Sequence, residues 1–157
     1  MYNHKRITDT KLLLKQVELF IEDAPSTISL LANLTALLKQ YYPDANWIGF
    51  YLAKEDYLYL GPFQGESACQ LIQWGKGVCG TAALTKTTQI VENVHKLKNH
   101  IACDVNSMSE IVIPIIINEK VYGVLDIDSP VEADFDKKDQ DFLEALVELI
   151  KPRLEII

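Results

Sequence analysis

The chain has 157 residues, of which 48% are hydrophobic, and this is enough for one folded domain with a sizeable core. A formal net charge of -7 without a basic cluster argues against a nucleic-acid surface and against attachment to anionic membranes. The longest apolar run, residues 111–117, is far shorter than the roughly 20 residues of a membrane helix, and no signal-peptide core follows Met1. We therefore expect a cytoplasmic protein whose partner is a small molecule or another protein.

Two amphipathic helices are predicted at the start of the chain. Apolar residues recur at helical spacing over residues 8–23, with Thr8 or Thr10 available as the N-cap. Pro25 ends this helix, and Ser26 can cap a second helix over residues 26–42.

A β-hairpin and a short helix are predicted next. Residues 47–53 and 57–63 are rich in aromatic and β-branched side chains, and a charged turn separates them. The segment 77–87 predicts a short helix that opens at the Gly-flanked Cys79. A cysteine at a helix N-terminus gains thiolate character if it is exposed.

The second half predicts more strands and a closing helix. A short strand over residues 88–91 and a polar loop over residues 95–109 lead to a hairpin of residues 110–117 and 121–127. A helix over residues 134–156 follows, with Pro152 perturbing its last turn. This order predicts an α+β fold in which helices cover one face of a central antiparallel β-sheet, while the other face carries a ligand or active-site loop region.

The three cysteines, Cys69, Cys79 and Cys103, lie in polar or Gly-rich stretches. This setting is typical of reactive thiols, because structural cysteines usually lie among aliphatic residues. In a reducing cytosol any disulfide among them would be catalytic or sensory. With His100 they could in number form a Cys3His zinc site, but they lack the close ligand pairs of such sites. We therefore expect no metal.

Three acidic residues lie at the open end of the second predicted hairpin. Glu110 begins one strand, and Asp126 and Asp128 lie two apart on the other, so they share a face of the sheet. Buried carboxyl groups hold their protons to higher pH and can then donate them. The alternative, that Asp126 and Asp128 cap a turn before Pro130, remains open here.

The first predicted strand carries Trp47, Phe50 and Tyr51, which could form one wall of an apolar subsite. Plain core packing is the alternative for these aromatic side chains, and it is favoured for Phe50.

Several motifs together resemble the GAF-domain free methionine-(R)-sulfoxide reductases. They are NWIGFYL, LGPFQGESAC, GKGVCGTA, HIACD, SEIVIPI and GVLDIDSP, and they extend over nearly the whole chain. The resemblance implies a single GAF domain over residues 1–157. It also implies reduction of free methionine-(R)-sulfoxide by cysteine thiols, without a cofactor, and regeneration by thioredoxin. A homodimer is a further expectation from the resemblance.

The same resemblance assigns roles to the cysteines. By the family pattern Cys103 is the nucleophile that becomes a sulfenic acid, and Cys69 is the resolving cysteine that forms a disulfide with it. Cys79 is expected near the site as an alternative resolving cysteine or a substrate contact.

The acidic and aromatic residues receive roles beside these thiols. From the chemistry we expect Glu110 and Asp128 to donate protons to the sulfoxide oxygen and Asp126 to bind the substrate ammonium. By the family pattern Trp47 and Tyr51 surround the S-methyl group.

A second hypothesis is a non-catalytic GAF sensor that binds a small ligand such as a cyclic nucleotide. We expect this less, because sensory GAF domains usually adjoin an output domain, for which 157 residues leave no room. A sensor would also leave the three cysteines without a role.

Overall fold

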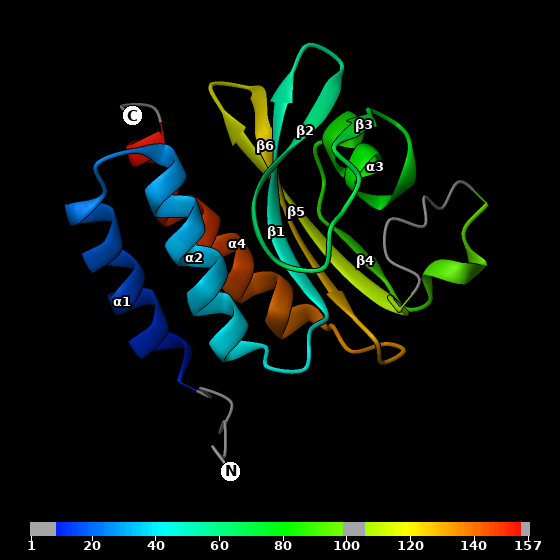
Figure 1. Cartoon of the computed structure of the whole chain (residues 1–157), viewed down its shortest axis with the longest axis horizontal. Coiled ribbons are helices and arrows are strands. Elements are labelled where there is room, and N and C mark those ends of the chain that lie inside the picture. The colour runs from blue at the N-terminus through cyan, green and yellow to red at the C-terminus, as the bar shows by residue number, and fades with distance from the viewer. Residues whose placement is uncertain (1–8, 99–105, 155–157) are drawn as a thin grey trace.

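The computed structural model describes residues 9–98 and 106–154. Within these ranges it contains four α-helices, one short 3-10 helix and six strands (Figure 1). The helices are α1 (Thr10–Asp23), α2 (Thr27–Tyr41), α3 (Gly77–Thr85), η1 (Val94–Lys96) and α4 (Lys137–Leu154). The strands are β1 (Trp47–Lys54), β2 (Tyr57–Gly65), β3 (Leu71–Gln73), β4 (Gln89–Val91), β5 (Ser109–Ile117) and β6 (Lys120–Ser129).

All described strands join one antiparallel sheet in the order β3-β2-β1-β6-β5-β4. Helices α1, α2 and α4 lie on one side of this sheet and α3 lies on the other (Figure 1). The predicted α+β arrangement is therefore confirmed. Among the described residues, no helix combines the length and the apolar character that crossing a membrane requires.

The helix ends follow from local hydrogen bonding. Asp9, not Thr10, caps α1, because its carboxylate accepts the N–H groups of Lys11 and Leu12. Ser26 caps α2 as predicted, accepting the N–H of Ser29. Pro152 lies in the last turn of α4, and the helix continues past it to Leu154.

Two short elements were missing from the sequence prediction. Strand β3 pairs with β2, but only Ile72 of its three residues is buried, so the segment has no apolar run. The 3-10 helix η1 overlaps the start of the predicted polar loop, and Asn93 caps it by accepting the N–H of His95.

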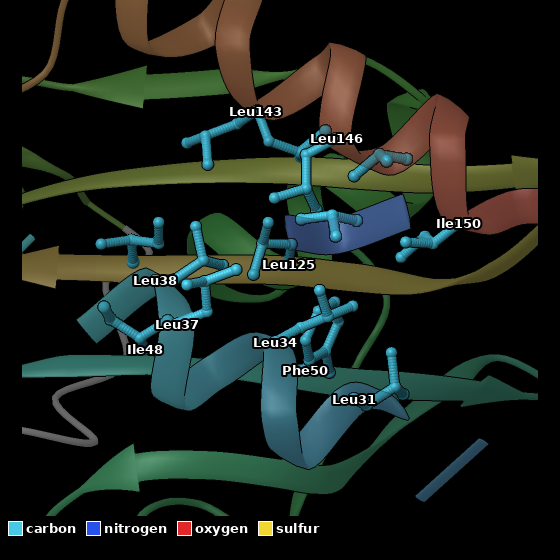
Figure 2. Close-up of a cluster of buried hydrophobic side chains, with 14 of the residues drawn as sticks. Leu31, Leu34, Leu37, Leu38, Ile48, Phe50, Leu125, Leu143, Leu146 and Ile150 are labelled. Atoms are coloured by element: carbon cyan, nitrogen blue, oxygen red, sulfur yellow. The ribbon is translucent and has the colours of Figure 1, made fainter. Parts of the chain in front are cut away.

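The main core fills the space between the sheet and helices α1, α2 and α4. Figure 2 shows leucines of α2 facing Ile48 and Phe50 of β1, Leu125 of β6 and the apolar side of α4. Phe50 is fully buried in this cluster, so the prediction that it is plain core is confirmed. Alternate residues of the same strands point to the opposite face, toward α3.

Candidate functional site

A second buried cluster lies between the sheet and α3. Its apolar members come from β1, β2, β3, β5, β6 and α3: Trp47, Tyr51, Leu58, Ile72, Val78, Cys79, Ala82, Ala83, Val112 and Val124. Unlike the main core, it adjoins buried acidic side chains. Among the described residues, the buried acidic side chains therefore lie on the α3 face of the sheet.

Strand pairing places three carboxyl groups at one end of β5 and β6. Glu110 pairs with Asp128, and Asp126 lies opposite Gly49 of β1. Glu110, Asp126 and Asp128 keep only 7%, 5% and 9% of their surfaces exposed. Asp126 and Asp128 lie inside β6, and their burial favours a role in this cluster over capping of the turn before Pro130.

Cys79 joins this acidic cluster from the first turn of α3. Its Sγ lies 3.9 Å from Oε1 of Glu110, to which it donates a weak hydrogen bond. One side-chain atom each of Cys79, Glu110 and Asp126 lies within 4.8 Å of the others. Residues from α3, β5 and β6, distant in sequence, thus form one compact buried group.

Burial keeps this group protonated beyond the ordinary range. Burial is the main cause of the raised pKa of Glu110, and the negative charges of Asp126 and Asp128 raise it further. Burial also raises the pKa of Asp126, although contacts with Glu110 and Cys79 offset part of the rise. The predicted direction is therefore confirmed for these two carboxyl groups.

Cys79 differs from an exposed thiol at a helix N-terminus. Only 4% of its surface is exposed, and burial, followed by the charges of Asp126 and Glu110, raises its pKa well above the ordinary value. The condition for thiolate character, exposure, is thus not met, and Cys79 is a protonated thiol at neutral pH.

An aromatic stack covers the neighbouring part of the sheet. The ring of Trp47 stacks on Tyr51 with centroids 5.7 Å apart and on Phe63 of β2 with centroids 5.3 Å apart. Trp47 Nε1 donates a hydrogen bond to the carbonyl of Glu66, and the Tyr51 hydroxyl donates one to the carbonyl of Cys69. Trp47 and Tyr51 therefore form an apolar wall and also fix the segment that carries Cys69.

Sequence reasoning missed two contributors to this wall, Phe63 and Gly49. A Cβ atom at Gly49 would lie 2.4 Å from Cη2 of Trp47 and 2.5 Å from Cβ of Phe63. The stack consequently needs glycine at this position. The signal in the sequence was a glycine between aromatic residues of a predicted strand, since such a glycine often marks a close approach.

The cysteines are in different states. Cys79 is a free thiol, whereas Cys69 is half-buried beside the aromatic wall and is disulfide-bonded. Cys103 and His100 lie outside the described residues, so the structure does not test the predicted nucleophile or the Cys3His set.

Comparison with known proteins agrees with this fold. The GAF domain family matches residues 26–155. The free methionine-R-sulfoxide reductase of Saccharomyces cerevisiae is 53% identical over 128 residues, which are 76% of this chain and 71% of the yeast protein. That of Escherichia coli is 49% identical over 122 residues, covering 78% of this chain and 74% of the relative.

A solved structure is also similar to this chain in fold. The free methionine-R-sulfoxide reductase from Neisseria meningitidis, in complex with its substrate, superposes with a TM-score of 0.89 at 39% identity and covers 93% of this chain and 88% of its own. These similarities extend over most of the chain and agree in the family they indicate. The chain belongs to the GAF-domain free methionine-(R)-sulfoxide reductases.

Proposed function

We propose that this protein reduces free methionine-(R)-sulfoxide to methionine with electrons from cysteine thiols. The observation that carries the proposal is the buried group of Glu110, Asp126 and Asp128 beside an aromatic wall, which in turn contacts a disulfide-bonded Cys69. The names of these two relatives support the same reaction.

The proposed reaction balances in two steps. The thiolate of Cys103 attacks the sulfoxide sulfur, and the oxygen takes up one proton and moves from that sulfur to the sulfur of Cys103. The bond between the two sulfurs then breaks, which leaves Cys103 as a sulfenic acid. Methionine leaves with its sulfur reduced by two electrons. The thiol of Cys69 then attacks the sulfenic acid, so that a disulfide forms and water leaves.

The proposed pairing of Cys69 with Cys103 has support in the cysteine inventory. The chain has three cysteines, Cys69 is disulfide-bonded and Cys79 is free. We propose that thioredoxin reopens the disulfide by thiol exchange. The raised pKa of Cys79 argues against a fast attack by this thiol, so we assign it a position beside the substrate.

The carboxyl groups supply protons to the sulfoxide oxygen in this proposal. Glu110 is the first proton donor, since burial raises its pKa well above the ordinary value and so favours the protonated form. Asp128, paired with Glu110 across the β5–β6 ladder, is the second donor. We assign Asp126 to the substrate ammonium, because an arriving positive charge lowers the pKa of a buried carboxyl and favours its ionised form.

Trp47 and Tyr51 give the proposed site its selectivity. Both rings are buried and stacked, so they offer a flat apolar surface to the S-methyl group. The two sulfoxide epimers would place the oxygen and the methyl group on exchanged sides. Only one epimer then presents its oxygen to Glu110 while its methyl group contacts the wall. The homodimer and the cytoplasmic location stay predictions from the resemblance and the composition.

The test is methionine formation from each epimer of free methionine sulfoxide, with dithiothreitol as reductant, by the wild type and by Cys103→Ser. We expect turnover of the R epimer alone and none by the variant. If neither epimer reacts, the reductase proposal fails and the ligand-sensor hypothesis becomes the better one. If Cys103→Ser keeps its activity, the nucleophile is Cys69 or Cys79.

A further inference from the structure

The group formed by Cys79, Glu110 and Asp126 has the composition of a metal site. It offers one sulfur and two carboxylate oxygens, all within 4.8 Å of one another. All three side chains are at least nine-tenths buried and come from three different elements, α3, β5 and β6. Their positions are therefore held by the sheet and by the packing of α3.

The spacing fits a small tetrahedral cation. Zinc–sulfur bonds of about 2.3 Å and zinc–oxygen bonds of about 2.0 Å place sulfur and oxygen ligands about 3.5 Å apart. The Sγ of Cys79 lies 3.9 Å from Oε1 of Glu110, so a shift of a few tenths of an ångström would close the ligand shell. Three protein ligands leave the fourth position to water, as in sites that bind an exchangeable group.

A second observation points to a missing ligand in this place. Oδ1 of Asp126 is fully buried and has no hydrogen-bond partner. An unsatisfied buried polar atom costs about 1–3 kcal/mol, and more when it is charged. A cation bound between Asp126, Glu110 and Cys79 would satisfy this oxygen.

We propose that Cys79, Glu110 and Asp126 bind one thiophilic divalent cation, Zn²⁺ or Cd²⁺, reversibly and with a water as the fourth ligand. The sulfur ligand selects such ions over Mg²⁺ and Ca²⁺, which prefer oxygen alone. This set differs from the Cys3His set considered on the sequence, because only Cys79 is shared. Glu110 and Asp126 come from paired neighbouring strands, so sequence spacing between cysteines and histidines could not reveal them.

The bound ion would inhibit turnover, and this consequence rests on the proposed function. An ion on Glu110 replaces the proton that Glu110 would give to the sulfoxide oxygen. The ion also occupies the carboxylate of Asp126, which we assign to the substrate ammonium. Inhibition should therefore be competitive with substrate.

The binding test uses Cd²⁺ alone on the variant Cys69→Ser/Cys103→Ser, in which Cys79 is the only thiol left in the chain. We expect one equivalent of Cd²⁺ to give a saturable thiolate-to-metal absorption band and to raise the Tm, whereas Mg²⁺ gives neither effect. If Cd²⁺ gives no saturable band or does not raise the Tm, the proposal is overturned. This test leaves Cys79, Glu110 and Asp126 unsubstituted, so misfolding of a ligand variant cannot explain the result.

Three further substitutions in this background identify the ligands. Cys79→Ser should abolish the band, and Glu110→Gln and Asp126→Asn should each weaken Cd²⁺ binding at least tenfold, which is about 1.4 kcal/mol. Both amides keep the shape of the side chain they replace. Glu18→Gln on the exposed side of α1 is the matched control and should bind like the background. Unchanged affinity in both amide variants would show binding by the thiol alone and would refute the three-ligand site.

Inhibition is measured separately, as methionine formed per protein in a single turnover of the reduced protein without added thiol. Zn²⁺ should inhibit the wild type with a midpoint at least tenfold below that of Cys79→Ser. Equal midpoints would contradict the inhibitory role. Absence of turnover in both proteins would refute the proposed reductase function, while the Cd²⁺ titration would still decide the metal site.

Discussion

The two faces of the sheet are built from alternate residues of the same strands, and they differ sharply in chemistry. Toward α2 and α4, strands β5 and β6 present Ile111, Leu125 and Ile127, each fully buried in the main core. Figure 2 shows Leu125 among the aliphatic side chains of α2 and α4. Toward α3, the neighbouring positions are Glu110 and Asp126, which are almost as deeply buried.

The difference teaches that burial alone does not say what a position contributes. Aliphatic side chains gain free energy when they leave water, whereas a carboxyl group loses hydration and must find a partner or a proton. The helix-covered face therefore stabilises the fold, and the α3 face carries a cost that only function explains. Substitutions on the two faces should have opposite signatures.

The largest effect is expected at Glu110. Glu110→Gln removes the proposed proton donor while keeping the size of the side chain, so kcat/KM should fall roughly 10²–10⁴-fold. Because the change also removes a buried acid, the Tm should stay the same or rise. The measurement is steady-state reduction of the R epimer together with thermal unfolding. Glu18→Gln is the control, and a Glu110→Gln protein with full activity would remove Glu110 from the mechanism.

A matched pair of neighbours on β6 tests the two faces directly. Leu125→Ala leaves a cavity in the main core and should lower the free energy of unfolding by about 2–5 kcal/mol, with little change in kcat/KM of the folded protein. Asp126→Asn should do the reverse, lowering kcat/KM while stability holds or increases. Urea unfolding and initial rates measure both. If both variants lose the same free energy of unfolding, the two faces contribute alike to stability and the proposed difference between them is wrong.

The pH dependence of stability should reveal the acidic cluster. The unfolded chain releases the protons of Glu110 and Asp126 near their ordinary pKa values of 4.5 and 3.8, whereas the folded chain keeps them to higher pH. The folded state thus binds more protons in this window, so the free energy of unfolding falls as pH rises toward the folded pKa values. The slope reaches at most about 1.4 kcal/mol per pH unit for each proton retained.

The measurement is urea unfolding between about pH 4 and about pH 8. This range lies below the ordinary thiol pKa of 9.0, so Cys79 does not titrate in it. The double variant Glu110→Gln/Asp126→Asn should show a flatter profile than the wild type, and Glu18→Gln should keep the wild-type profile. A wild-type protein that gains stability over this window relative to the double variant would contradict the raised pKa values.

Most of the fold could be predicted from hydrophobic periodicity. Long amphipathic segments fixed α1, α2 and α4, and alternation along β6 placed Asp126 and Asp128 on one face. Strand β3 was missed because its pairing with β2 depends on a tertiary contact and only Ile72 is buried. Short segments of this kind carry too little pattern to be recognised.

The sequence singled out several residues that the structure brings together, but it did not indicate their geometry. The sequence indicated that Glu110 and Cys79 matter, yet not that Sγ of Cys79 lies beside a carboxyl oxygen of Glu110. That contact depends on how α3 packs against β5 and β6, which local spacing does not encode. The same packing buries Cys79 and raises its pKa, against the helix-end effect that applies to an exposed thiol.

The smallest effect is expected at Tyr51. Tyr51→Phe keeps the ring that stacks on Trp47 but removes the hydroxyl that donates to the carbonyl of Cys69. The loss should be about 0.5–1.5 kcal/mol in the free energy of unfolding. Tyr59→Phe on the exposed side of β2 is the control and should cost less.

Methionine release in a single turnover should stay near the wild-type rate, because the apolar wall is intact. Formation of the disulfide, which is monitored as the loss of free thiols, should be slower in Tyr51→Phe, because the segment that carries Cys69 loses its hydrogen bond to β1. If Tyr51→Phe and Tyr59→Phe behave alike in both measurements, the hydroxyl of Tyr51 does not position Cys69, and the aromatic wall acts on the substrate alone.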